Sequence, residues 1–306
     1  MKISFIVPLY NEDKVIKACL DSIVSEMKNG DEIIVIDNGS TDNSIKFVKS
    51  YNGIKLFRKP KLTIAGLRNF GARLASGELL AFIDADCIIC PNWRINVIDT
   101  MSNADVAACG SKYDIPVGAR WIEKAWFSQK RKSEGKVNYI NSGNLVVKKD
   151  IFIEAGGFNE DLVTGEDAEF GLRLDKANYV IWENPMIKVI HLGNPKDIWS
   201  FYKKQCWHGL GMFGTMKISF FDKPVLMTAL FLLFLIFGII SFFLINNIVF
   251  AFSSISFFLF FIPIVSAFYR VMQYQNFIYF PHLVVLYLLY FLARINALFK
   301  ITIGQV

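Results

Sequence analysis

Two aspartates directly after an apolar run are the residues of this chain best suited to chemistry. Residues 79–83 are all apolar, Asp84 and Asp86 follow them, and the next lysine or arginine is Arg94. Carboxylates held this close together repel each other, so a fold that keeps them there calls for a cation. A hard divalent cation bound through carboxylates and substrate phosphates would meet that need. The alternative is a pair of carboxylates that simply face water.

Alternating strand-like and helix-like segments lead up to these aspartates. Repeated units of this kind predict a parallel sheet with helices on both faces, and ligands then bind outside the carboxyl ends of the strands. The expected strands are residues 2–7, 32–36, 54–57 and 79–83, and the expected helices are residues 12–25, 40–50 and 64–75.

Polar residues follow three of the expected strands. They occupy residues 8–12, 37–42 and 84–86, and neighbouring parallel strands would bring them to one edge of the sheet. This arrangement predicts an acidic crevice rich in turns. For residues 37–40 a turn with a helix cap is an equally good interpretation, because Asp, Asn, Gly and Ser favour such positions anyway.

All but three of the charged residues lie in the first three quarters of the chain. All 27 acidic residues and 30 of the 33 basic ones precede Pro224, which leaves a net charge of +3 on residues 1–223. A surplus this small gives no support to nucleic-acid binding by charge. The five cysteines are odd in number, and we expect them to be reduced and structural.

The C-terminal quarter has the composition of membrane helices. Residues 224–245 and 248–269 are uncharged and each long enough to span the hydrocarbon core, with Asn246 and Asn247 as a turn between them. A third apolar run, residues 277–293, could either span the membrane or lie in its interface. Four lysines precede the first span and no signal peptide is evident, so we expect residues 1–223 to be cytoplasmic. The lysines are Lys203, Lys204, Lys217 and Lys223.

Six short motifs, in order, resemble those of family 2 glycosyltransferases. The resemblance covers about residues 3–195 and implies the GT-A fold of that family, an α/β fold with a mixed sheet, followed here by a helical membrane domain. Its motifs are VPLYNE at 7–12, DNGSTD at 37–42, RNFGAR at 68–73, FIDAD at 82–86, GGFNE at 156–160 and GEDAE at 165–169.

The resemblance implies a donor site around a metal ion. Asp84 and Asp86 match the family's DxD motif, which engages the ribose and the metal-bound diphosphate of a nucleotide sugar. Asp86 would bind Mg2+ or Mn2+, and His191 lies where some relatives supply a further metal ligand. For His191 a strand-end histidine with a backbone partner is an equal alternative. The other donor-binding residues implied are Pro8, Tyr10, Glu12, Asp37, Arg68 and Asn144.

The resemblance also implies a catalytic base. Asp167 matches the aspartate of the family's ED motif, which deprotonates the acceptor, and Glu166 beside it would raise the pKa of that base. Metal-assisted departure of the nucleoside diphosphate, together with a base for the acceptor, suits a single displacement that inverts the anomeric centre. Residues 141–144 resemble the family segment that lines the sugar and acceptor site, and an ordinary hairpin turn is nearly as good an interpretation.

The sequence departs from the processive members of the family. These carry a QxxRW motif, whereas this chain reads Gln205-Cys206-Trp207 without the arginine. We expect a GT-A catalytic domain at 1–197, an amphipathic interfacial segment at 198–223 and a membrane domain at 224–306 with two or three spans.

The expected function is transfer of one sugar to a membrane-associated acceptor, in the cell membrane of a prokaryote. The acceptor would be a polyprenyl phosphate, a lipid-linked saccharide or a glycolipid. The alternatives are a catalytically inactive, membrane-tethered module that binds a nucleotide sugar, a processive polysaccharide synthase, and a small transporter subunit. The spans show no charge before Arg270, which disfavours a transporter.

Overall fold

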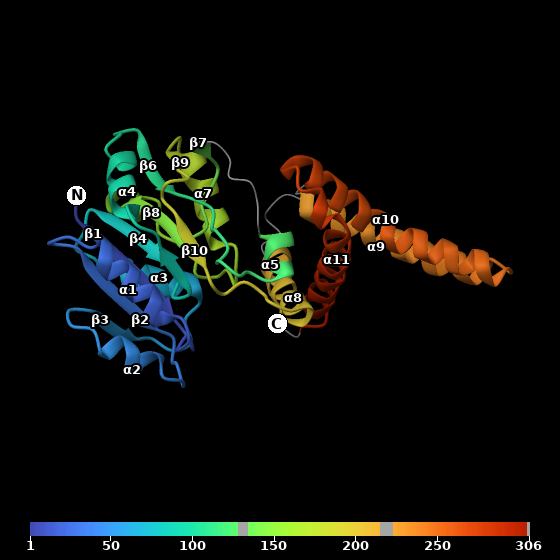
Figure 1. Cartoon of the computed structure of the whole chain (residues 1–306), viewed down its shortest axis with the longest axis horizontal. Coiled ribbons are helices and arrows are strands. Elements are labelled where there is room, and N and C mark those ends of the chain that lie inside the picture. Colours follow the sequence, from blue (N-terminus) through green and yellow to red (C-terminus); the bar gives the residue numbers. More distant parts are fainter. Residues whose placement is uncertain (128–133, 215–222, 305–306) are drawn as a thin grey trace. The chain divides into compact units, whose positions relative to one another are not determined.

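The computed structural model describes residues 1–127, 134–214 and 223–304. The chain forms two compact units. The first consists of Met1–Val117 and Arg131–Asn194, and the second of Gly118–Lys130 and Pro195–Val306 (Figure 1). We call them the α/β unit and the helical unit.

Four parallel strands form one half of the main sheet of the α/β unit. Their order is β3-β2-β1-β4, so β1 lies between β2 and β4, with Phe5 facing Ile33 on one side and Ala81 on the other. Each expected strand is present, within two residues at either end. The strands are β1 (Ile3–Leu9), β2 (Glu32–Asp37), β3 (Lys55–Arg58) and β4 (Leu79–Ile83).

The other half of this sheet is mixed. The order continues from β4 through β8, β6 and β9 to β7; β8 is antiparallel to β4 and β6, β9 is parallel to β6, and β7 is antiparallel to β9. The mixed sheet expected for a GT-A fold is therefore confirmed. These strands are β6 (Val106–Gly110), β7 (Gly135–Val137), β8 (Asn144–Lys148) and β9 (Val180–Glu183).

Helices cover both faces of the main sheet, as Figure 1 shows. Side chains alternate along β1, so Phe5 and Val7 belong to one core while Ile6 belongs to the other. The first core is completed by α1 (Ile16–Glu26), α2 (Ser44–Lys49) and α4 (Trp93–Met101). The second is completed by α3 (Ile64–Leu74), α6 (Lys149–Glu154) and α7 (Glu166–Lys176).

The first helix begins four residues later than the sequence predicts. The backbone amides of Asn11 and Glu12 donate instead to Ser40 Oγ and Ser44 Oγ, both at 2.9 Å. Hydroxyls of the loop after β2 therefore hold the loop after β1. The expected start of α2 moves for a similar reason, because Asp42 accepts the amide hydrogens of Ser44 and Asp13.

The helical unit contains three helices that are long and apolar enough to cross a membrane: Lys223–Leu244, Ile248–Tyr274 and Phe277–Thr302. The third helix continues nine residues beyond Ala293, so the apolar run of residues 277–293 belongs to a helix that is long enough to cross a membrane. In these segments lie α9 (Lys223–Leu244), α10 (Ile248–Tyr274), η1 (Phe277–Tyr279) and α11 (Phe280–Thr302).

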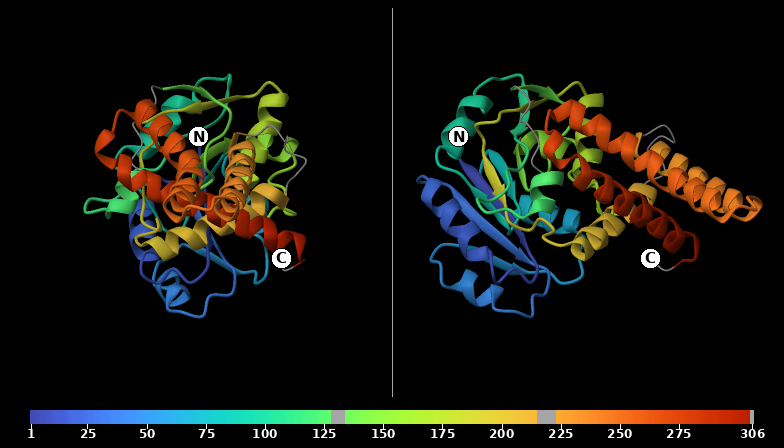
Figure 2. Two further views of the ribbon diagram at one scale, coloured as in Figure 1. Left: turned by 90° about the vertical axis from the view of Figure 1, so that its right-hand side faces the viewer. Right: turned by 45° about the vertical axis from the view of Figure 1, so that its right-hand side comes forward.

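The helices α9 and α10 form the hairpin that the sequence predicts, and they lie side by side in Figure 2. Asn247 caps α10, its side chain accepting from the amides of Val249 and Phe250. Ser241 Oγ and Ser254 Oγ lie 2.7 Å apart across the pair. Small polar residues of this kind are common between membrane helices, where backbones approach closely.

A short helix from the middle of the sequence belongs to the helical unit. It is α5 (Trp121–Trp126), and its Trp126 ring packs edge-on against Phe201 of α8 (Ile198–Gly214) and Tyr287 of α11. The guanidinium of Arg270 lies over the same ring, 4.5 Å from its centroid. Of the expected interfacial segment 198–223, α8 accounts for residues up to 214, and residues 215–222 lie outside the described residues.

Candidate active site

The carboxyl ends of several strands meet at one edge of the main sheet. The parallel strands β1, β2 and β4 end there, and β6 also does, because two antiparallel pairings through β8 return it to the direction of β4. Asp37 is the last residue of β2, and the loops after β1, β4 and β6 carry Tyr10, Asp84 and Tyr113. The acidic edge predicted from the sequence is therefore present.

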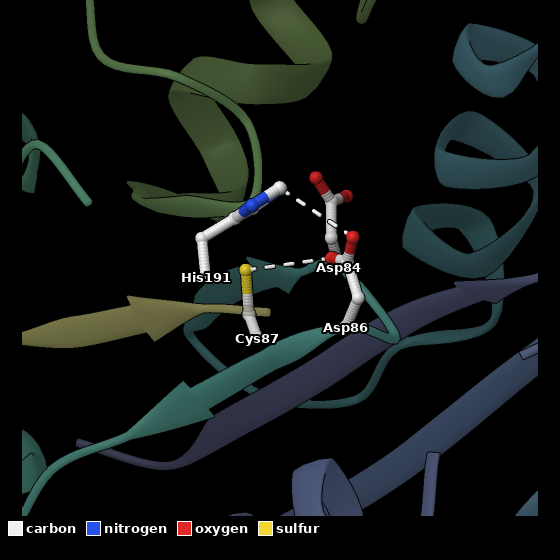
Figure 3. Close-up of side chains that lie close together, drawn as sticks. All are labelled: Asp84, Asp86, Cys87 and His191. Atoms are coloured by element: carbon white, nitrogen blue, oxygen red, sulfur yellow. Dashed lines mark hydrogen bonds and ion pairs between the residues drawn. The ribbon is translucent and has the colours of Figure 1, made fainter. Parts of the chain in front are cut away.

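Four possible metal ligands gather beyond the end of β4. They are Asp84, Asp86, Cys87 and His191, with ligand atoms within 4.8 Å of one another (Figure 3). The strand β5 (Cys87–Ile89) pairs with β10 (Val189–His191), and this pairing sets His191 opposite Cys87. His191 Nε2 then lies 3.4 Å from Asp86 Oδ2. The structure thus brings His191 to the aspartates although 104 residues separate it from Cys87.

The donor set of this cluster fits a hard divalent cation. Two carboxylates and an imidazole suit Mn2+, and carboxylates alone suit Mg2+. Cys87 fits less well, because burial and the nearby aspartate charges raise the pKa of its thiol well above the usual value. The backbone at Gly193 lies close to the carboxylate of Asp86, because a Cβ atom there would overlap it. Asp84 and Asp86 are thus a possible metal site.

A buried arginine lies beneath the cluster. Arg68 is 3% exposed, and its Nη2 donates to Asp84 Oδ1 at 2.5 Å while its Nη1 donates to Glu166 Oε1 at 2.6 Å. Both end nitrogens of the guanidinium are therefore bound to carboxylates. A buried charge of this kind requires such partners, because desolvation is costly. In this geometry Arg68 lies behind the aspartates, holding one of them.

The candidate base lies at the start of α7. Asp167 accepts from the backbone amides of Ala168 at 2.8 Å and Ser142 at 3.3 Å. Burial, and then the charge of Glu166, raise the pKa of Asp167 to about 6. A carboxylate of this basicity can accept a proton near neutral pH and remain largely ionised before it does so.

A short loop separates the candidate base from the aspartate pair. Ser142 donates from its amide to Asp167 and from Oγ to Glu166, the latter at 3.2 Å. The next residue is Gly143, where an added Cβ would overlap the carboxylate of Asp84. Ser142 thus contacts the candidate base, and the adjacent Gly143 contacts the aspartate pair.

Tyr113 belongs to the site although the sequence did not single it out. Its ring stacks on His191 with centroids 4.9 Å apart, and its hydroxyl accepts from the amide of Gly143 at 2.9 Å. Burial, and then the charge of Asp84, raise the pKa of the Tyr113 hydroxyl well above its usual value. Its position three residues past the end of β6, at the active edge, is the signal that could have revealed it.

The residues expected around the nucleotide lie at the ends of β1 and β2 and in the loop after β1. Pro8 is buried within β1, Tyr10 is 57% exposed, and Glu12 begins the turn before α1. Asp37 is fully buried and accepts from the amides of Gly39 and Ser40, which is the geometry of a turn. Of these residues, only Tyr10 presents a large exposed side chain.

Asn144 is held inside the sheet. Its Nδ2 donates to the carbonyls of Ser111 and Ile187, and its Oδ1 accepts from Trp93 Nε1 at 2.9 Å. The side chain is fully buried. Asn144 therefore stabilises the start of β8, behind the loop that carries Ser142 and Gly143.

Comparison with known proteins supports the motif resemblance. Residues 4–157 match the family model described as glycosyl transferase family 2, and residues 83–294 match that described as glycosyl transferase family group 2. The first match covers the aspartate pair, and the second extends over most of the helical unit.

Three curated relatives illustrate the range of similar proteins. Glycosyltransferase AglE of Haloferax volcanii is 30% identical over 189 residues, which are 58% of this chain and 62% of AglE. The uncharacterized glycosyltransferase YibD of Escherichia coli is 33% identical over 205 residues, 58% of each chain. Beta-monoglucosyldiacylglycerol synthase of Nostoc sp. is 26% identical over 57% of this chain and 42% of its own. The chain thus spans less than two thirds of the length of these relatives.

Solved structures with low sequence identity share the fold. Mannosyltransferase PcManGT from Pyrobaculum calidifontis, in complex with GDP-Man and Mn2+, aligns with a TM-score of 0.61 at 16% identity, covering 97% of this chain and 86% of its own. GalNAc-T7 with UDP, GalNAc and Mn2+ aligns with a TM-score of 0.54 at 17% identity, covering 72% and 52%. Fold and family matches agree, and the chain belongs to glycosyl transferase family 2.

Proposed function

We propose that this chain is an inverting glycosyltransferase that moves a single sugar from a nucleotide-sugar donor to a membrane-associated acceptor. One observation carries the proposal. The loop of Ser142 and Gly143 touches Asp84 on one side and Asp167 on the other, so a group that leaves toward the aspartate pair and a proton that leaves toward Asp167 can belong to one reacting centre.

The proposed reaction is a single displacement. The acceptor hydroxyl gives its proton to a carboxylate oxygen of Asp167 while its oxygen forms a bond to the anomeric carbon of the donor. The bond from that carbon to the diphosphate breaks, and the nucleoside diphosphate leaves with the electron pair. Attack from the face opposite the leaving group inverts the configuration at that carbon.

The aspartate pair would serve the leaving group. Asp84, Asp86 and His191 are the residues that would hold Mg2+ or Mn2+, which supplies a Lewis acid for the charge that develops on the diphosphate. Arg68 would keep Asp84 in place from below, and Tyr113 would fix the plane of the His191 ring. These protein groups are already in position, so little reorganisation is needed at the moment of reaction.

The helical unit supports a membrane-associated acceptor. Its three long apolar helices suit a bilayer, and four lysines before and at the start of α9 favour a cytoplasmic α/β unit. The chain lacks the arginine of the processive QxxRW motif, which favours transfer of one sugar.

The test is calorimetric titration of the detergent-purified chain with a panel of nucleoside diphosphates, in Mn2+ and in chelator, followed by transfer assays with the matching nucleotide sugars. We expect one base to bind in a metal-dependent way. Asp86→Ala should abolish this binding, whereas Asp167→Asn should keep it and abolish transfer. Asp105→Ala, at an exposed aspartate of the same unit, is the matched control and should behave as wild type.

Two results would contradict the proposal. Failure of every nucleoside diphosphate to bind would leave the aspartate pair without its ligand. Metal-dependent binding without any transfer or donor hydrolysis would favour a catalytically inactive binding module instead.

A further inference from the structure

A cavity of about 400 Å³ lies in the α/β unit, apart from the aspartate pair. Its lining comes from residues 111–112 after β6, from residues 136–141 in and after β7, and from Glu183 at the end of β9. The lining does not include Asp84, Asp86, Asp167 or His191, although Asn141 opens the segment 141–144 that was considered above as a sugar site. The volume falls within the range of about 300 to 1,000 Å³ that is usual for ligand pockets.

Two residues that line this cavity are followed directly in the sequence by residues of the candidate active site. On one wall Lys112 is followed by Tyr113, whose hydroxyl accepts from the Gly143 amide at 2.9 Å. On the other wall Asn141 is followed by Ser142, whose amide donates to Asp167 at 3.3 Å. A ligand in the cavity would therefore lie next to the candidate base, on the side of Ser142 and Gly143.

Beside the apolar side chains of Val137 and Ile140, the lining has a polar part that carries both signs of charge. Lys112 and Lys136 offer ammonium donors, Glu183 offers a carboxylate, and Asn138 offers an amide that both donates and accepts. Lys136 also pairs with Asp175 at 3.4 Å, which lowers the positive character of its wall. Such a lining suits a neutral ligand with many hydroxyls better than a bare phosphate, which would meet the Glu183 carboxylate.

An aromatic ring adds a flat apolar surface to this polar lining. Tyr139 lines the cavity and is 48% exposed, although its Cβ and backbone pack tightly against Gly171 of α7. The ring is therefore fixed at its base and open at its face. A fixed aromatic face among hydrogen-bonding groups suits a sugar ring, which has apolar C–H faces and a polar rim.

We infer that this cavity binds a sugar of the acceptor, so that the acceptor is a saccharide carried on a membrane lipid. The inference rests on the proposed function and narrows its acceptor class. One hydroxyl of the bound saccharide would give its proton to Asp167, its oxygen would bond to the anomeric carbon of the donor, and the nucleoside diphosphate would leave with the electron pair. An unglycosylated polyprenyl phosphate would leave the cavity without a ligand.

The experiment compares acceptors on the full-length chain. The probes are prenyl diphosphates that carry one glucose, galactose, mannose or N-acetylglucosamine, and the prenyl phosphate of the same chain length without a sugar. We expect transfer to at least one sugar-bearing probe and none to the bare phosphate. Tyr139→Ala should raise KM for that probe about tenfold with little change in kcat, because it removes binding made before the reaction.

Matched variants separate the cavity from general damage. Tyr139→Phe keeps the ring and should raise KM less than Tyr139→Ala does. Lys136→Ala should also raise KM, whereas Lys46→Ala, an exposed lysine on α2, should leave it unchanged. Metal-dependent binding of the nucleoside diphosphate should be the same in all four variants.

The outcomes also separate this inference from the proposed function. Two results would overturn the inference without contradicting the proposed glycosyltransferase function. One is transfer to the prenyl phosphate without a sugar at the rate of the best sugar-bearing probe, and the other is an unchanged KM in Tyr139→Ala. Saturation-transfer NMR with the four methyl glycosides gives a readout that needs no turnover. Absence of signal from every glycoside would also overturn the inference. Failure of the unmodified chain to bind any nucleoside diphosphate would instead overturn the proposed function.

Discussion

Arg68 Nη1 donates to Glu166 Oε1 at 2.6 Å, and this bond joins residues 98 positions apart. The other end nitrogen of the same guanidinium holds Asp84. One buried cation therefore ties the loop after β4 to the start of α7. The two carboxylates come from the two motifs that are expected to serve the leaving group and the base, so Arg68 sets the distance between them.

Replacing this arginine should be costly. Arg68→Met keeps the length of the side chain but leaves Asp84 and Glu166 without their cation, and loss of one partner of a buried ion pair costs about 3 to 5 kcal/mol. We expect a large fall in the thermal midpoint of the α/β unit and weaker metal-dependent donor binding. Arg73→Met is the control, because Arg73 is on the same helix but 64% exposed, and exposed pairs contribute at most about 1 kcal/mol. Equal effects of the two substitutions would contradict the role of Arg68.

The rate of transfer should depend on pH through Asp167. The base acts only when it has lost its proton, and its pKa is raised to about 6. The rate should therefore fall as the pH drops through about 6 and reach a plateau above 7. A pH profile of kcat/KM measures this limb.

A substitution of Glu166, the residue beside Asp167, should shift the acidic side of the pH profile. Glu166→Gln keeps the hydrogen bonds to Arg68 and Ser142 but removes the negative charge that raises the pKa of Asp167. The acid limb should shift to lower pH. A limb that stays in place, in a variant that still turns over, would mean that another group sets it.

The same aspartate should reduce stability at neutral pH. Its pKa in the folded chain, about 6, lies above the usual value near 4, so the folded state keeps a proton that the unfolded state has lost. The free energy of unfolding then falls as the pH rises from about 4 to 6, by up to about 3 kcal/mol. Asp167→Asn should raise the thermal midpoint at pH 7.5, and the gain should vanish at pH 4. Asp105→Asn, at an exposed position, should show no such gain.

A methyl group near the aspartate pair should weaken donor binding. At Gly193 an added Cβ would overlap the Asp86 carboxylate, so Gly193→Ala must displace either the backbone or that ligand. We expect the affinity for the nucleoside diphosphate in Mn2+ to fall about tenfold or more. Gly135→Ala is the matched control, because nothing lies within 4 Å of a Cβ there. Titration calorimetry of both variants decides the question.

Local patterns in the sequence were sufficient to predict the parallel half of the main sheet. The strands β1, β2 and β4 are buried on both faces and read as largely apolar runs. A rule about strand ends then leads from Leu79–Ile83 to Asp84 and Asp86. The membrane hairpin followed from length and the absence of charge. In each case the signal lies within about twenty consecutive residues.

Other parts of the site depend on pairings between distant residues. The position of His191 depends on β10 pairing with β5, a short sheet with no strong local signal. Tyr113 enters because β6 returns to the direction of β4 through β8, which only the order of the whole sheet reveals. The burial of Arg68 could not be predicted either, because its partners Asp84 and Glu166 lie 16 and 98 positions away in the sequence.

The position of the helix α5 in the chain limits how this protein can be truncated. Because α5 belongs to the helical unit, the chain crosses between the two units three times: after Val117, before Arg131 and after Asn194. A truncation after Asn194 would thus keep α5 while deleting its partners Phe201, Ala267 and Leu286, and would expose an apolar surface in water. A soluble catalytic fragment therefore requires replacement of α5 as well as removal of the C-terminal helices. In the sequence, the replaced segment lies between residues 112 and 136, which both line the cavity described above.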